Sequence, residues 1–256
     1  MSNDNTEFPK IIHQIYGFWD KTIPKNIKNR MDTWKKLHPN YKYILWGKKN
    51  SREFIKEKYN WFLQLYDNYP YHVQRADALR YFILYYYGGI YSDIDLEPVK
   101  SIDPILEKYK NKSAILYRSA NSGLITNDFM ISKPGNNFWK KVWNEMLLNY
   151  NFSSFSKHLI VMYSTGPLLL DSVYENSSLK KKQAYIINSK YINNCDLSEI
   201  KPCYNKEAFL KRYEGNSWHS IDSTFFNFFY TYYKIILLVF IIIVIFLIVV
   251  LEKKSV

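Results

Sequence analysis

The chain has 256 residues, of which 47% are hydrophobic, so it can bury the core of one substantial domain or two small ones. Its formal net charge of +12 suits an anionic partner. Nucleic acid is disfavoured as that partner, because the sequence holds no concentrated basic stripe and no nucleic-acid-binding motif. The two cysteines, Cys195 and Cys203, form no CxxC pair, which argues against a structural zinc site and leaves one disulfide open.

Apolar strand patterns alternate with amphipathic helix patterns along the chain. Strands are predicted for residues 10–19, 41–46, 90–95, 113–119, 123–132 and 183–192, and helices for residues 24–37, 51–67, 71–87 and 136–150. Pro24 suits the first turn of its helix, and Gly88 with Gly89 suits the end of another. This alternation predicts an α/β protein with a layered sheet.

A long apolar segment lies near the C-terminus. Residues 235–251 contain no charged or polar side chain and would rise about 25 Å as a helix, at the short end of what spans a bilayer. An aromatic juxtamembrane segment, residues 223–234, precedes it, and a short tail, residues 252–256, follows it. The first ten residues are polar, so we expect a single-pass C-terminal anchor without a signal peptide, the soluble residues 1–222 facing the cytosol. A buried core helix is the alternative.

Acidic residues gather at the end of the strand predicted for residues 90–95. Asp93 and Asp95 are two residues apart, so on a strand their side chains would lie on the same side. Carboxylates at this spacing suit Mg²⁺ or Mn²⁺ when substrate phosphates complete the coordination. A D-x-D pair alone is a weak signal, and a solvated strand face would also explain it. Its place at a strand end, where open α/β sheets bind ligands, favours the metal.

A second charged group lies on the helix predicted for residues 71–87. Asp77 and Arg80 are three residues apart and therefore share a face of this helix, with Arg75 nearby. In an otherwise apolar helix they could form a structural ion pair or a ligand site, and their spacing does not separate the two.

Several motifs occur in one order along the chain. They are PKIIHQIYG, YKYILW, QRADALRYFILYYYGGIYSDIDLE, NDFMISKPGNNFW, YSTGP and NSWH. Together they resemble glycosyltransferase family 32, the sugar transferases with a D-x-D motif, over roughly residues 8–222. Within that family they look closest to the fungal mannosyl inositol phosphorylceramide synthase catalytic subunits. The resemblance implies that residues 1–222 form a catalytic domain of the GT-A fold, a Rossmann-like domain that binds a nucleotide sugar.

The resemblance also implies roles for the charged residues. Asp93 and Asp95 match the D-x-D motif, with Asp95 the more direct metal ligand and Asp93 contacting ribose or sugar. Asp77 and Arg80 match the R-A-D-x-x-R helix, which with Arg75 would hold the donor sugar and its phosphates. A guanidinium is suited to phosphate oxygens because its planar fork stays charged.

Further contacts follow from the other matching segments. Tyr16 stands where relatives often carry Trp, in a position suited to stacking on the base. Ser217, Trp218 and His219 match a late S-W-H motif expected to reach the metal or the leaving phosphate. His219 could bind the metal as neutral imidazole, or it could be an ordinary surface histidine.

The resemblance implies a metal-dependent hexosyltransferase that retains anomeric configuration and uses Mn²⁺ or Mg²⁺. It favours GDP-mannose as donor and an inositol phosphorylceramide-like lipid as acceptor, on a Golgi or ER-type membrane in a eukaryotic host, with a small regulatory subunit as a candidate partner. Three alternatives stay open: transfer to protein-linked or other glycans, an inactive membrane-tethered binding module, and a phosphatase of the haloacid dehalogenase type. The phosphatase is disfavoured because its acids are expected after the first strand.

Overall fold

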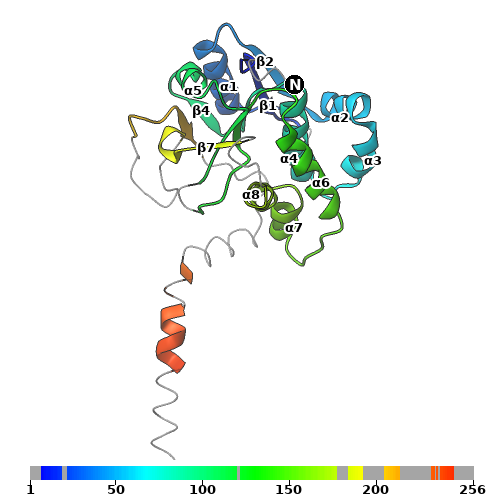
Figure 1. Cartoon of the computed structure of the whole chain (residues 1–256), viewed down its shortest axis with the longest axis vertical. Helices are drawn as coiled ribbons and strands as arrows, with labels where there is room; N and C mark the ends of the chain where they lie inside the picture. Colours follow the sequence, from blue (N-terminus) through cyan, green and yellow to red (C-terminus); the bar gives the residue numbers. More distant parts are fainter. Residues whose placement is uncertain are drawn as a thin grey trace, which may run out of the picture. The chain divides into compact units, whose positions relative to one another are not determined.

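The computed structural model describes residues 7–18, 22–119, 122–177, 184–192 and 205–213, together with residues 232–244 apart from 234 and 236. The chain divides into two compact units. One comprises Met1–Ser154 and Leu159–Gly215, and the other comprises Phe155–His158 and Asn216–Val256. The first unit contains the layered α/β structure drawn in Figure 1.

A mixed six-stranded sheet forms the centre of the first unit, in the order β2-β1-β3-β6-β5-β7. Its strands are β1 (Ile11–Ile15), β2 (Lys42–Trp46), β3 (Gly89–Ser92), β5 (Ala114–Tyr117), β6 (Phe129–Ser132) and β7 (Tyr185–Ile187). β1 is parallel to β2 and β3, and β5 is parallel to β7, whereas β6 is antiparallel to both of its neighbours. The sheet confirms the predicted α/β class.

Helices cover both faces of this sheet. They are α1 (Lys25–Leu37), α2 (Lys48–Lys58), α3 (Asn60–Asn68), α4 (His72–Tyr86), α5 (Asp103–Lys108), α6 (Asn137–Leu148), α7 (Lys157–Ser164) and α8 (Pro167–Glu175), followed by the 3-10 helix η1 (Ser189–Tyr191). The single helix predicted for residues 51–67 is wrong, because the chain breaks at Tyr59. The break lets the Tyr59 ring pack 4.6 Å from the ring of Phe82 and 5.3 Å from that of Trp143.

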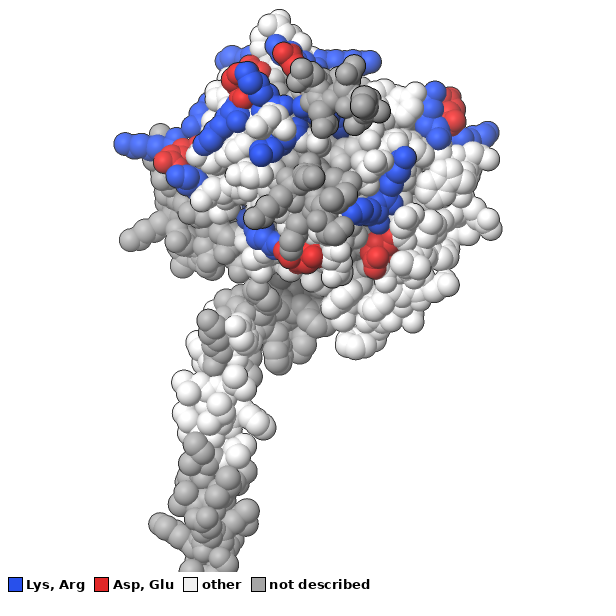
Figure 2. Space-filling view, viewed as in Figure 1, with Lys and Arg blue, Asp and Glu red and all other residues white. Residues whose placement is uncertain are grey.

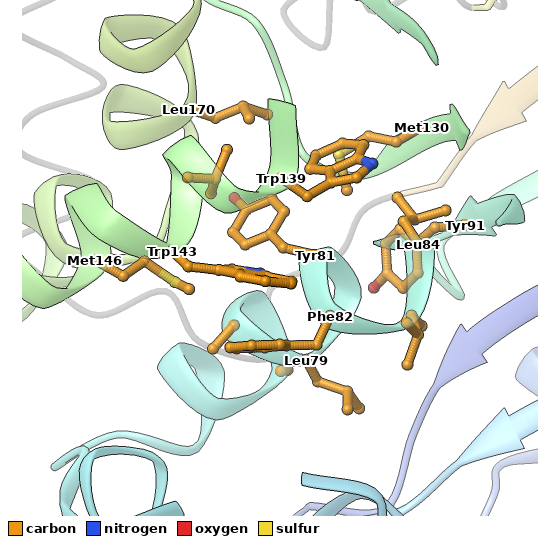
Figure 3. Packing of buried hydrophobic residues seen from close by; sticks show 14 of the residues in the cluster. Leu79, Tyr81, Phe82, Leu84, Tyr91, Met130, Trp139, Trp143, Met146 and Leu170 are labelled. Carbon is orange, nitrogen blue, oxygen red and sulfur yellow. The ribbon is translucent and has the colours of Figure 1, made fainter. Parts of the chain in front are cut away.

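Two hydrophobic cores lie on the opposite faces of the sheet. The larger core packs α4 against α6, with the ring of Phe82 stacked 4.6 Å from that of Trp143, and Tyr81 stacked 5.8 Å from Trp139 (Figure 3). The smaller core joins α1 and α5 to alternate strand residues such as Ile90. Since α4 is buried along most of its length, its few charged side chains must find partners inside the protein.

A second, two-stranded sheet follows the D-x-D segment. It pairs β4 (Leu96–Pro98) with β8 (Leu210–Arg212) in antiparallel fashion, Leu96 lying opposite Arg212. Neither strand is predicted from the sequence, because each has only three residues and β8 begins more than 100 residues after β4 ends. This pairing brings a late segment of the chain to the end of β3.

The predicted membrane anchor, residues 235–251, lies partly outside the described residues. Within the second unit, residues 237–244 are helical. In the part of the chain that the structure describes, no helix is both long and apolar enough to cross a membrane.

Candidate active site

The D-x-D motif lies in a turn and not on a strand. β3 ends at Ser92, and the backbone N–H of Leu96 donates to the carbonyl of Asp93 at 3.1 Å, which closes the turn. The prediction that residues 90–95 form one strand is therefore wrong at its end. The turn still starts directly at the end of β3 in the main sheet. There the N–H of Asp93 donates at 2.7 Å to the carbonyl of Asp128, the residue before β6.

Arg80 connects the helix motif to the D-x-D turn. Its guanidinium lies 2.9 Å from the Asp77 carboxylate and 3.2 Å from Asp93, and donates to the carbonyl of Asn127 at 2.7 Å. It also lies 4.7 Å from the centre of the Tyr91 ring. The planar fork of arginine can serve these partners together, which a lysine ammonium could not do in the same geometry. The structure thus brings three predicted site residues into one cluster.

Asp77 is the most enclosed acid of this cluster. It accepts hydrogen bonds from Asn127 Nδ2 at 3.1 Å and from Thr165 Oγ1 at 3.2 Å. Burial raises the pKa of Asp77 to about 7, and Arg80 opposes that rise. The side chains of Asp77 and Arg80 are 5% and 6% exposed, whereas that of Asp93 is 31% exposed. Direct contact of Asp77 and Arg80 with a donor therefore stays a prediction, whereas the structure shows the ion pair of Arg80 with Asp93 and that of Arg80 with Asp77.

Asp95 lies beside a separate group of polar side chains. Arg212 of β8 forms an ion pair with Asp128, and its Nη1 lies 4.0 Å from Asp95 Oδ2. The hydroxyl of Tyr117 donates to Asp128 at 2.7 Å and accepts from Arg212 at 2.9 Å, and Thr126 also donates to Asp128. The antiparallel pairing of β4 with β8 holds Arg212 in this place.

The carboxyl groups of Asp93, Asp95 and Asp128 differ in the direction in which their pKa is shifted. Burial raises the pKa of Asp95 to about 7, with Asp93 adding to the rise and Arg212 opposing it. Burial also raises the pKa of Asp93. Burial would raise the pKa of Asp128 too, but Arg212 and the hydrogen-bond donors around Asp128 outweigh burial and bring it below its usual value. Asp128 is therefore an ionised carboxylate at neutral pH.

The residues present fit a divalent cation that a substrate helps to bind. Asp95 Oδ1 is buried and has no hydrogen-bond partner among the residues that the structure describes. Over the same residues, no group of three or more His, Cys, Asp or Glu side chains could hold a metal ion. Two carboxylates nevertheless suffice for Mg²⁺-like ions when substrate phosphates and water supply the other oxygens. Asp93 and Asp95 are the residues that would hold such an ion.

Two further predicted residues, Tyr16 and Arg75, bond to backbone carbonyls of their own neighbourhoods. The hydroxyl of Tyr16 donates to the carbonyl of Thr22 at 3.3 Å, and Arg75 donates to the carbonyl of Tyr69. The late motif lies outside the described residues and comprises Ser217, Trp218 and His219. The same holds for Cys195 and Cys203, whose pairing stays open.

Sequence reasoning missed Asn127, Asp128 and Arg212. Asp128 directly precedes a buried strand, whereas the D-x-D motif follows one, and it reaches the same end of the sheet because β6 is antiparallel to β3; an acid beside an apolar strand was the sequence signal for it. Arg212 carried no such signal, because its place follows from a pairing of two short strands far apart in the sequence.

Comparison with known proteins identifies the family. Residues 24–112 match the model of the glycosyltransferase sugar-binding region containing a DXD motif. Over 204 residues the chain is 30% identical to an uncharacterized glycosyltransferase of Acanthamoeba polyphaga mimivirus, covering 76% of each chain. The chain belongs to the DXD glycosyltransferase family. This glycosyltransferase is also 38% identical over 227 residues to inositol phosphoceramide mannosyltransferase 3 of Schizosaccharomyces pombe, covering 88% of the present chain.

The fold of this glycosyltransferase is shared with the glycosyltransferase domain of a toxin. The ligand-free glycosyltransferase domain from the YGT toxin superposes with a TM-score of 0.55 over 72% of this chain and 80% of that domain, at 11% identity. The glycosyltransferase spans 59% of the length of its fission yeast relative, so it matches somewhat more than half of that protein.

Proposed function

We propose that this glycosyltransferase transfers mannose from GDP-mannose to an inositol phosphoceramide-like lipid, with retention of configuration. The observation that carries the proposal is the Arg80 bridge, which joins the R-A-D-x-x-R helix to the D-x-D turn in a chain 38% identical to an inositol phosphoceramide mannosyltransferase. The name of that relative supports the sugar and the acceptor. The mixed sheet, with its acids at a strand end, supports the nucleotide-sugar donor.

In this proposal Asp93 and Asp95 are the residues that would hold Mn²⁺ or Mg²⁺ beside the donor diphosphate. The ion supplies positive charge that stabilises the leaving nucleoside diphosphate. The buried guanidinium of Arg80 holds Asp93 through an ion pair at 3.2 Å, so the Asp93 carboxylate keeps its position during the reaction. The anomeric carbon becomes oxocarbenium-like as its bond to the phosphate oxygen breaks, and an acceptor hydroxyl attacks the same face, forming the new C–O bond while its proton passes to the departing diphosphate oxygen.

Other contacts belong to the same proposal. Tyr16 would stack on the base, Arg75 would approach the donor phosphates, and His219 with its two preceding residues would reach the leaving phosphate. Supporting this, Tyr16 directly follows β1 at the edge where the D-x-D turn lies. Substituting Tyr16 by Ala should raise the KM for the donor more than it lowers kcat, and an unchanged KM would remove this role.

We also propose that residues 235–251 anchor the enzyme in an endomembrane, where a lipid acceptor lies. Residues 1–222 would form the catalytic domain, and a small regulatory subunit would be a candidate partner. The apolar composition of the segment supports the anchor.

The test is nucleotide release and transfer by the full chain in detergent, with GDP-mannose and a panel of UDP-sugars, in Mn²⁺, Mg²⁺ or chelator. Asp95→Asn should lower turnover by about 10²–10³-fold, because it removes a charged ligand at the leaving group. Asp32→Asn is the matched control, since Asp32 is 53% exposed and pairs with Lys35 on the surface.

Each result has a defined meaning. Turnover of GDP-mannose with inositol phosphoceramide, lost with chelator and in Asp95→Asn, supports the proposal. Turnover only with a protein-linked glycan would replace the acceptor. Folded protein that binds and turns over no donor in the panel would indicate a tethered binding module.

A further inference from the structure

Arg212 lies between two acids and serves them unequally. It forms an ion pair with Asp128 and hydrogen bonds to Tyr117, but it stays 4.0 Å from Asp95, beyond hydrogen-bonding distance. Asp95 therefore interacts electrostatically with the positive charge of Arg212 but forms no hydrogen bond with it. The side chains of Arg212 and Asp95 are 22% and 20% exposed, so their interaction is only partly screened by water.

The arrangement of backbone and side chains fixes this distance. Arg212 lies opposite Leu96 in the β4–β8 pair, and the N–H of Tyr213 donates to the carbonyl of Asp95 at 2.8 Å. Asp128 holds the guanidinium on its other side. Arg212 is therefore kept near the D-x-D turn by two strands and directed away from Asp95 by Asp128.

The charges of the whole cluster are not balanced within it. Two guanidinium groups face four carboxyl groups, which belong to Asp77, Asp93, Asp95 and Asp128. When all four carboxyl groups are ionised the excess is negative, and an excess of negative charge attracts a divalent cation. Of the two acids that would hold the cation, Asp93 and Asp95, Arg212 reduces that attraction more strongly at Asp95, which lies 4.0 Å from its guanidinium and whose Oδ1 has no hydrogen-bond partner among the described residues.

We propose that Arg212 is a positioning residue that sets the cation affinity of the D-x-D turn. It weakens the binding of a free divalent cation to Asp95, so that the cation binds well only together with a nucleoside diphosphate, whose negative charge offsets the guanidinium. This inference rests on the proposed function, because it takes Asp95 as a cation ligand. It assigns Arg212 and Asp128 a role in the order of loading.

The test measures the binding of Mn²⁺ alone to the full chain by electron paramagnetic resonance, at low ionic strength. Arg212→Gln should bind Mn²⁺ about tenfold more tightly than the wild type, because a positive charge near the carboxylate is removed. A residue that only stabilised the site would give the opposite change or none. Arg212→Lys, which keeps the charge, should stay near the wild type. Lys211→Gln is the matched control, because it makes the same charge change on the same strand at an exposed side chain.

A second variant tests the inference without altering any charge. Tyr117→Phe removes the hydroxyl that bonds both Arg212 and Asp128. The guanidinium is then freer to reach Asp95, and Mn²⁺ affinity should fall several-fold. Unchanged or weaker affinity in folded Arg212→Gln, or unchanged or tighter affinity in folded Tyr117→Phe, would overturn the role of Arg212.

The same titrations separate this inference from the proposed function. If Asp95→Asn removes Mn²⁺ binding while Arg212→Gln leaves it unchanged, the metal site stands and the role of Arg212 fails. If the wild type binds no Mn²⁺ even with GDP present, the metal site fails and the role of Arg212 fails with it.

Discussion

His13 lies on β1 with both ring nitrogens engaged. Its Nδ1 lies 3.1 Å from Trp46 Nε1, and its Nε2 lies 3.0 Å from the carbonyl of Gly88. Because an indole N–H can only donate and a carbonyl can only accept, Nδ1 accepts and Nε2 carries the proton. The ring is therefore neutral, and burial lowers the pKa of His13 to about 4. Protonation in the folded state would cost Nδ1 its role as acceptor.

This histidine should make stability depend on pH. The pKa of His13 is 6.5 in its ordinary state and about 4 in the fold, so the unfolded chain binds the proton more readily. The contribution is fully present above pH 6.5, declines as pH falls and is lost by about pH 4, a loss of about 3 kcal/mol. Urea unfolding at several pH values should show this decline.

The control for this prediction is His13→Gln, which cannot titrate. His38 also has a pKa lowered by burial and contributes in the same direction, so the difference between the two proteins at each pH is the quantity to read. Equal pH dependence in both would contradict the assignment to His13.

Single residues of the site were predictable when they belonged to a local pattern. Asp77 and Arg80 share a helix face, and Asp93 follows an apolar strand, so spacing made them candidates, and the resemblance to the family assigned them to the site. Their mutual contacts depend on how α4 packs on the sheet, which no local spacing gives. Arg212 was unpredictable for the same reason, because its partners Asp95 and Asp128 lie on other segments.

The connection from α4 to β3 requires glycine at one position above all. Gly89 has φ +89°, and a Cβ there would lie 2.5 Å from the carbonyl oxygen of Ile11 on the neighbouring strand β1. Both the backbone conformation and the contact therefore exclude a side chain. Gly123 shares the positive φ, at +68°, but nothing lies within 4 Å of its Cβ position.

Comparing these two glycines separates the effects. Gly89→Ala should lower the free energy of unfolding by about 2–5 kcal/mol, through backbone strain and overpacking together. Gly123→Ala should lose only about 1–2 kcal/mol, through strain alone. Chemical denaturation followed by circular dichroism measures both. Equal losses of unfolding free energy would contradict the role of the contact with Ile11, because they would mean that β1 and β3 can move apart at Gly89 without destabilising the fold.

Elements with a long periodic pattern were predicted well. α4 and α1 lie within a residue of their predicted bounds, because each has an unbroken apolar pattern and a proline or glycine at one end. The break at Tyr59 was missed, since the apolar pattern continues through it. The strand predicted for residues 123–132 is wrong in its first half: regular pairing begins only at Phe129.

At the scale of the molecule, charge and apolar composition act in different places. Figure 2 shows a face on which lysine and arginine side chains are more widespread than acids, consistent with the net charge of +12. The acids of the site lie instead at the end of β3. An excess of positive charge on the protein raises the local concentration of an anionic donor. The α/β class was predictable from alternation, but the antiparallel β6 was not, because alternation does not give strand direction.

The proposed anchor makes a prediction for the whole chain. Ile241→Arg together with Ile243→Arg puts two charges into the middle of residues 235–251, where each would cost about 3 kcal/mol in a bilayer. We expect the wild-type chain to stay with membranes after alkaline carbonate extraction and the double variant to be released. Lys253→Gln with Lys254→Gln serves as the control outside the apolar segment. Wild-type protein found in the supernatant would contradict the anchor.

Because β4 pairs with β8, part of the site can form only late in synthesis of the chain. The ribosome delivers Asp95 first, and the hundred-odd residues up to Arg212 take roughly 10 s to translate. During that interval Asp77 can already meet Arg80, since both lie on one helix. Asp128 must wait for its guanidinium until β8 has emerged. A nascent chain halted before β8 therefore holds this acidic centre without the guanidinium of Arg212, so translation of β8 completes the ion pairs among these residues.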